Sequence, residues 1–154
     1  MLKKISLFSI FLFLSSCGYE AIYSKKNSIN YNFSISELAF VGDRGTNLKI
    51  KERLKNYTLS EKNKNFILKI SSTSTKTVTA RDTSGDAISF KNTVATKIEV
   101  LMNNKFKNSF VIAESFNYNN NSNKFSLKRY ETEIKKNLAE TVSDKLIFKL
   151  SNIK

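Results

Sequence analysis

The sequence contains no histidine, tryptophan or proline, and it has only one cysteine and four glycines. The absence of histidine excludes most zinc sites and every catalytic arrangement that depends on an imidazole. A single cysteine excludes a disulfide within the chain. No close pair of carboxylates stands in a recognisable catalytic motif, and Asp82 and Asp86 are better explained as turn residues. Neither a calcium-loop spacing nor a phosphate-binding glycine loop is present. We therefore expect a protein that is not an enzyme and that holds no metal.

Positive charge is in large excess over negative charge. The chain has 26 Lys and Arg against 13 Asp and Glu, a formal net charge of +13. Such a balance indicates an anionic partner, for which nucleic acid, a phospholipid surface and a phosphorylated glycan are the classes to consider. Only four of the basic residues are Arg, and Lys and Asn are abundant throughout, so part of this charge reflects composition alone. The 154 residues, 40% of them hydrophobic, suffice for the core of one domain.

Residues 1–16 have the features of a secretory signal peptide. Two lysines precede an apolar stretch over residues 5–14, which is shorter than the roughly 20 residues that span a membrane. The stretch ends in Leu14-Ser15-Ser16-Cys17, which resembles the lipobox of bacterial lipoproteins. The resemblance implies that Cys17 is acylated and becomes the mature N-terminus, anchored by two or more acyl chains. The alternative is an inert buried cysteine.

The same resemblance predicts the compartment. Gly18 follows the cysteine, and the Asp associated with inner-membrane retention is missing, which implies an outer-membrane anchor and a domain facing the periplasm. Export excludes nucleic acid as the partner. We divide the chain into a signal peptide (1–16), a lipidated N-terminus and tether (17–29) and a single folded domain (30–154).

Within that domain, hydrophobic periodicity predicts the first two elements. Apolar and polar residues alternate over 30–36, which is typical of a half-buried strand. A break at 42–45 follows, and Thr46 is expected to cap a helix. The spacing of Ile50, Leu54 and Tyr57 places them on one face of that helix.

The sequence predicts three strands joined by turns in the middle of the domain. The strands are expected over 66–79, 87–101 and 110–118, with turns at 82–86 and 103–105. The third strand has Val111 and Ala113 opposite Phe110 and Ile112, which predicts burial on both of its faces.

A long helix is expected to close the domain over residues 126–150. Its apolar stripe recurs every three or four positions. Core packing explains this stripe better than a coiled coil, which needs a longer heptad run. The predicted fold is α+β, with two helices packed on one face of a roughly four-stranded mixed β-sheet, preceded by the lipoprotein signal peptide. The expected members of the stripe are Leu127, Tyr130, Ile134, Leu138, Val142, Leu146 and Leu150.

Four basic residues form the candidate anion-binding set. Lys76 and Arg81 bracket the Thr-rich strand, Lys97 lies within a strand and Lys105 lies at a hairpin. If these strands are neighbours, the cations gather at one edge or tip of the sheet and bind phosphate or carboxylate through charge-assisted hydrogen bonds. The alternative is that they are solvated lysines in a Lys-rich chain.

The chain resembles the LPS-assembly lipoprotein LptE family. The resemblance rests on Cys17-Gly18-Tyr19, Arg44-Gly45, Ala80-Arg81 and the order of the elements up to the closing helix. It implies a non-catalytic subunit that plugs and helps to assemble the large outer-membrane β-barrel LptD, and that binds lipopolysaccharide in transit. The acyl chains on Cys17 would be the only prosthetic groups. The alternative is a free-standing lipoprotein that binds phospholipid or peptidoglycan without a barrel, and a periplasmic enzyme ranks last.

Overall fold

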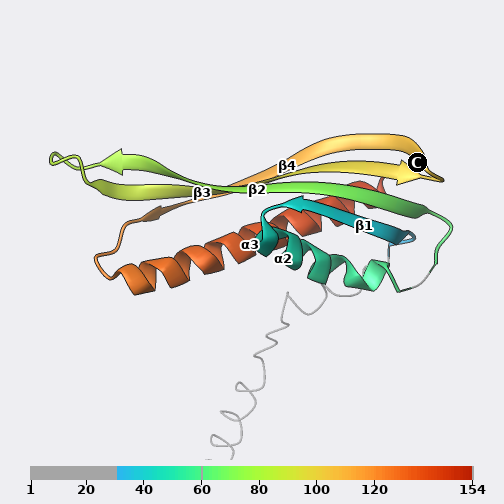
Figure 1. Cartoon of the computed structure of the whole chain (residues 1–154), viewed down its shortest axis with the longest axis horizontal. Helices are drawn as coiled ribbons and strands as arrows, with labels where there is room; N and C mark the ends of the chain where they lie inside the picture. Colours follow the sequence, from blue (N-terminus) through green and yellow to red (C-terminus); the bar gives the residue numbers. More distant parts are fainter. Residues whose placement is uncertain (1–30, 60, 154) are drawn as a thin grey trace, which may run out of the picture. The chain divides into compact units, whose positions relative to one another are not determined.

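The computed structural model describes residues 31–59 and 61–153. The expected signal peptide, Cys17 and the whole of the tether lie outside these residues. The described part forms a four-stranded sheet with two α-helices and one short 3-10 helix (Figure 1). In chain order the elements are β1 (Ser34–Gly42), α2 (Arg44–Leu54), η2 (Lys55–Tyr57), β2 (Asn65–Arg81), β3 (Ala87–Met102), β4 (Lys105–Asn119) and α3 (Lys124–Ser151).

The strand order across the sheet is β1-β2-β3-β4. β1 runs parallel to β2, and α2 makes the crossover between them, while β2, β3 and β4 are antiparallel neighbours. Asn103 and Asn104 form the β3–β4 turn with φ of 52° and 59°. Two consecutive positive φ angles suit a two-residue hairpin whose twist matches the sheet, and Asn tolerates them. The predicted α+β fold with a mixed sheet is therefore confirmed.

Both helices cover the same face of the sheet (Figure 1), and the core lies between the two layers. Ile50 and Leu54 from α2 are fully buried there, as the predicted spacing requires. The stripe of α3 is buried along most of its length, which confirms core packing, but Tyr130 is 49% exposed. The sheet contributes Phe66, Leu68, Ile70, Val94, Ile98 and Val100, each at most 1% exposed.

A bulge keeps the first strand in phase with the core. β1 begins at Ser34, later than the alternation over 30–36 predicts, and its register shifts between Ile35 and Glu37. After the shift, Leu38 pairs with Leu68 and Phe40 pairs with Ile70, on the face covered by the helices. One extra residue reverses the alternation of faces, so both halves of this strand contribute to the core.

The first helix begins earlier than predicted. Its N-cap is Asp43, whose Oδ1 accepts a hydrogen bond from the Thr46 backbone N–H at 2.8 Å, so the expected cap at Thr46 is wrong. Gly42, with φ +96°, turns the chain out of β1 at once, and a Cβ there would lie 2.0 Å from the Ser72 carbonyl oxygen. Only glycine satisfies both the conformation and the close approach. Thr46 is buried in the first turn of the helix instead.

The expected burial of β4 on both faces is also wrong. Ile112 is 4% exposed on the helix side, whereas Val111 on the other side is 63% exposed. Both helices pack on one face, so no described element covers the opposite one.

Candidate functional site

The sheet face opposite the helices has no covering layer among residues 31–59 and 61–153, and we call it the open face. Strand register assigns its side chains, because they alternate with the buried set. Most of them carry hydroxyl, amide or ammonium groups, with small apolar residues between them. They include Lys69, Ser71, Thr73, Thr75 and Thr77 of β2, Lys91, Thr93, Ala95, Lys97 and Glu99 of β3, and Ser109, Val111, Ala113, Ser115 and Asn117 of β4.

The hydroxyls of the open face retain bonding capacity toward a partner. Thr73 Oγ1 donates to the Ala95 carbonyl and Thr77 Oγ1 donates to the Lys91 carbonyl, each at a long distance of 3.5 Å. A hydroxyl that donates one bond still offers its two lone pairs. Ala95 and Ala113 pair directly across β3 and β4. Their side chains are shorter than those of the Thr and Lys residues that flank them on the same face.

Lys76 lies on the opposite, helix-covered side of β2. Its Nζ contacts Glu131 Oε1 of α3 at 2.5 Å and lies 3.8 Å from the centroid of the Phe90 ring. The ion pair and the cation–π contact both use the ammonium group. Lys76 is thus held within the fold, and its side chain remains 39% exposed.

The same Glu131 carboxylate joins a second strand to the helix. Tyr118 Oη donates to Glu131 Oε1 at 2.8 Å. Burial, and then this hydrogen bond, raise the pKa of the Tyr118 phenol well above its usual value. Lys76, Tyr118 and Glu131 therefore connect β2, β4 and α3 in one polar cluster. Sequence reasoning missed it, because 55 residues separate Lys76 from Glu131 and no local pattern marks the three.

Arg81 lies at the end of β2, at the β2–β3 turn. Its Nη1 donates to the Gly85 carbonyl within that turn at 2.7 Å, and the residue is exposed. A guanidinium has five N–H donors, so this single bond leaves most of them available to an anion.

The remaining two candidates lie elsewhere. Lys97 is on the open face, where its Nζ contacts Glu99 Oε1 at 3.0 Å. Lys105 pairs with Met102 at the β3–β4 turn, whereas Arg81 pairs with Ala87 at the other end of β3. The 16 residues of β3 separate the two ends by about 50 Å. The expectation that the four cations gather at one edge or tip is wrong, because successive turns of an antiparallel sheet lie at opposite ends.

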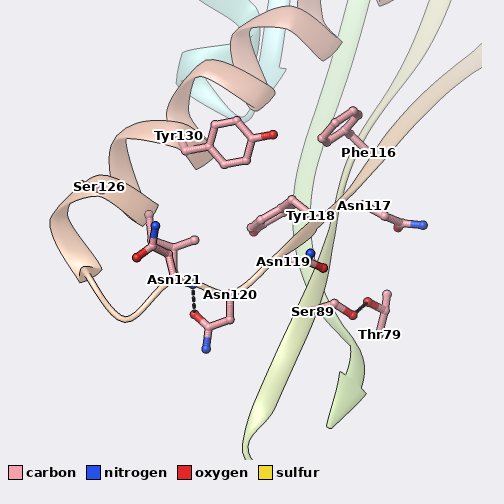
Figure 2. A pocket seen from close by; sticks show the side chains of 11 residues that line it. Thr79, Ser89, Phe116, Asn117, Tyr118, Asn119, Asn120, Asn121, Ser126 and Tyr130 are labelled. Atoms are coloured by element: carbon pink, nitrogen blue, oxygen red, sulfur yellow. Dashed lines mark hydrogen bonds between the residues drawn. The ribbon is translucent and has the colours of Figure 1, made fainter. Parts of the chain in front are cut away.

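A polar pocket lies at the same end of the sheet as Arg81, and we call it the Asn pocket. It has a volume of about 720 Å³ and lies between the end of β4, the loop after it and the start of α3. Figure 2 shows the rings of Phe116 and Tyr130 on opposite sides of it, with Tyr118 below them and Asn121 on the loop. Amides and hydroxyls beside aromatic rings suit a ligand with many hydroxyl groups.

The expected lipidation site, Cys17, lies outside the described residues, so the structure does not test it. Of the described helices, none is both long and apolar enough to cross a membrane.

Comparison with known proteins shows which solved structures share this fold. Neither protein-family models nor curated proteins give a match. Among solved structures, the chain is similar to rare lipoprotein B from Shewanella oneidensis, with a TM-score of 0.55 and 12% identity over 75% of this chain and 97% of that one. It is also similar to a minor lipoprotein from Acinetobacter baumannii, with a TM-score of 0.58 and 10% identity over 77% and 92% of the two chains. At these identities the likeness shows a shared fold.

Proposed function

We propose that this protein is an outer-membrane lipoprotein of the lipopolysaccharide transport machinery. In this proposal Cys17 carries the acyl anchor, the domain faces the periplasm and fits inside an LptD-like barrel, and it binds lipopolysaccharide on its way to the cell surface. It acts without catalysis, metal or any cofactor beyond the acyl chains. The lipobox at 14–17 supports the anchor, and the two similar solved structures are described as lipoproteins.

The open face is the observation that carries the barrel part of the proposal. A sheet that packs helices on one side can leave its other side in contact with water or with a polar partner, provided that the free side is polar. Here that side is lined with Thr, Ser, Asn and Lys, which matches the polar interior of an outer-membrane barrel. A domain that fills a lumen must offer hydrogen bonds outward while its own core stays closed, as this one does.

The lipopolysaccharide part rests on the end of the sheet that bears Arg81. The Asn pocket offers neutral polar groups and rings suited to sugars, and Arg81 supplies a cation suited to phosphate or carboxylate. Lys76, Lys97 and Lys105 remain candidates at separate places, each of which would meet a different part of the ligand.

Co-purification from detergent-solubilised outer membrane tests the proposal. We expect a large β-barrel to accompany the tagged protein, and we expect Ala113→Glu to abolish that association. Ala113 is exposed on the open face, so the fold should tolerate the larger side chain. Asn137→Glu places the same charge on exposed α3 surface and serves as the matched control.

Three outcomes would count against it. Absence of the barrel would favour the free-standing lipoprotein. Loss of the barrel with Asn137→Glu alone would show that the helix layer, and not the open face, contacts it. An unprocessed chain in the cytosol would overturn the lipid anchor.

A further inference from the structure

The first described residues of the chain, the start of β2 and the β3–β4 turn all lie at one end of the domain. β1 begins there at Ser34, which pairs with Asn65 at the start of β2, and Phe66 pairs with Met102 at the β3–β4 turn. The end of α3 joins them, since Lys64 Nζ donates to the Ile153 carbonyl at 2.8 Å. We call this the tether end. It is the right-hand end in Figure 1.

The tether end is rich in unpaired positive charge. Lys105 and Lys107 follow the β3–β4 turn, Lys149 lies in the last turn of α3 and Lys55 lies in η2. All four are exposed, and within the described part of the chain none of them forms an ion pair. The lysines between the two helices differ: Lys135, for example, is paired with Asp43. Glu61 is also exposed at this end, between η2 and β2, but it forms no ion pair with any of the four lysines.

Large apolar side chains lie exposed beside these cations. Leu59, Phe106 and Phe148 are 71%, 68% and 62% exposed. Phe148 and Phe110 line a hollow of about 580 Å³ together with two of the lysines, and Lys149 Nζ lies 5.3 Å from the centroid of the Phe110 ring. Exposed rings interleaved with lysines are typical of surfaces that sit at a membrane interface, where the rings enter the headgroup layer and the ammonium groups meet lipid phosphates.

The position of the proposed anchor identifies the occupant. The 14 residues from Cys17 to residue 30 precede the described domain, and at full extension they reach at most about 50 Å. The chain joins the domain at the tether end, so that end is the part held closest to the membrane and at the highest effective concentration there. Phe125 and Lys124 are also exposed, but they lie at the opposite end of the sheet.

We propose that the tether end docks on the acidic phospholipid headgroups of the membrane that holds Cys17. This inference rests on the lipid anchor of the proposed function and adds a second attachment that fixes the orientation of the domain. A single lysine near an acidic surface changes the docking equilibrium about fivefold. The acyl chains already hold the domain at the membrane, so docking does not have to offset the entropy lost on association. Several lysines and three exposed apolar side chains therefore suffice to stabilise one orientation.

Fluorescence quenching on the acylated full-length mature protein tests this. With Cys17 blocked by acylation, an introduced cysteine is the only free thiol, so Asn108→Cys reports on the tether end and Ser84→Cys on the opposite one. The labelled proteins are placed in vesicles of phosphatidylcholine with or without about 30% phosphatidylglycerol, containing a headgroup quencher. We expect quenching at position 108 in acidic vesicles only, its loss in high salt, and none at position 84.

Charge variants supply the control. Combined Lys105→Gln, Lys107→Gln and Lys149→Gln should lower the ratio of docked to undocked protein tenfold or more, since each lysine contributes about fivefold. Combined Lys124→Gln, Lys128→Gln and Arg129→Gln remove the same charge from α3's first turns and should leave it unchanged.

Several results would overturn the inference. These are equal quenching at positions 108 and 84, equal quenching in neutral vesicles, no effect of the first triple variant, or quenching only when lipopolysaccharide replaces the phospholipid. Mass spectrometry showing an unacylated Cys17 would remove both this inference and the proposed function. Docking in acidic vesicles, together with absence of the barrel from the co-purification, would remove the barrel role alone.

Discussion

Lys135 Nζ lies 2.7 Å from Asp43 Oδ2, which ties the middle of α3 to the residue that caps α2. The other oxygen of the same carboxylate accepts the Thr46 backbone N–H at 2.8 Å. Burial raises the pKa of the Asp43 carboxyl, but the hydrogen bonds from Lys135 and Thr46 outweigh it and lower the pKa below its usual value of 3.8. One side chain thus both starts a helix and fastens the two helices together.

The first prediction concerns the pH dependence of stability. A pKa lowered by folding stabilises the protein above the usual Asp value, and that contribution is lost as the pH falls through the folded-state pKa. Asp43→Asn keeps a capping side chain and removes the charge, so it should lower the free energy of unfolding at pH 7 and have little effect at the lowest pH. Asp43→Ala should cost about 1 kcal/mol more at pH 7, because the cap is lost. Urea unfolding at both pH values measures these free energies. A difference between wild type and Asp43→Asn that stays constant with pH would contradict the prediction.

The second prediction tests the cluster around Glu131. Tyr118→Phe removes the hydrogen bond to Glu131 and should cost about 1 kcal/mol. Tyr130→Phe is the matched control, since Tyr130 is 49% exposed and its hydroxyl has no hydrogen bond within the described residues; it should change stability by less than about 0.5 kcal/mol. Because folding raises the pKa of Tyr118, the wild-type advantage over Tyr118→Phe should shrink above about pH 10. Equal effects of the two substitutions would argue against the cluster.

The third prediction separates backbone strain from a steric clash at two glycines. Gly42 and Gly85 have similar φ angles of +96° and +88°, but a Cβ at Gly42 meets the Ser72 carbonyl oxygen at 2.0 Å and one at Gly85 meets nothing within 4 Å. Gly85→Ala should therefore cost about 1 kcal/mol from strain alone. Gly42→Ala should cost several-fold more and shift the start of α2. Thermal melts of the two variants compare these costs directly, and similar melting temperatures would show that β1 and β2 separate easily here.

The fourth prediction places the lipopolysaccharide contact. Arg81→Glu should weaken lipopolysaccharide binding while the protein stays folded and bound to the barrel, because a repulsive carboxylate replaces the guanidinium beside the Asn pocket. Lys107→Glu lies at the opposite end of the sheet, after the β3–β4 turn, and should leave binding unchanged. Binding to immobilised lipopolysaccharide at low and moderate salt measures both. Undiminished binding by Arg81→Glu at either salt concentration would remove Arg81 from the site.

The sequence predicted the type of each secondary-structure element better than it predicted where the elements begin and end. The periodicity of Ile50 and Leu54 and the stripe of α3 predicted which helix faces are buried, because a 3.6-residue period is a local property of the chain. The helix start was placed at Thr46 and not at Asp43, although Asp is the better N-cap of the two. Gly42, with φ +96°, turns the chain out of β1 directly before Asp43, so the helix begins there.

The sequence by itself determined the alternation of the strands, the helical stripes and the α+β class. It also contains the segment at 14–17 that resembles a lipobox and from which an anchor at Cys17 is predicted. The tertiary structure alone decided that no element among the described residues covers the other face, so that Val111 is exposed, and that Arg81 and Lys105 lie at opposite ends of the sheet. It also decided that Lys76 and Tyr118 meet at Glu131. The physical reason is that periodicity follows from neighbours in the chain, whereas strand order and side-chain clusters follow from contacts between residues tens of positions apart.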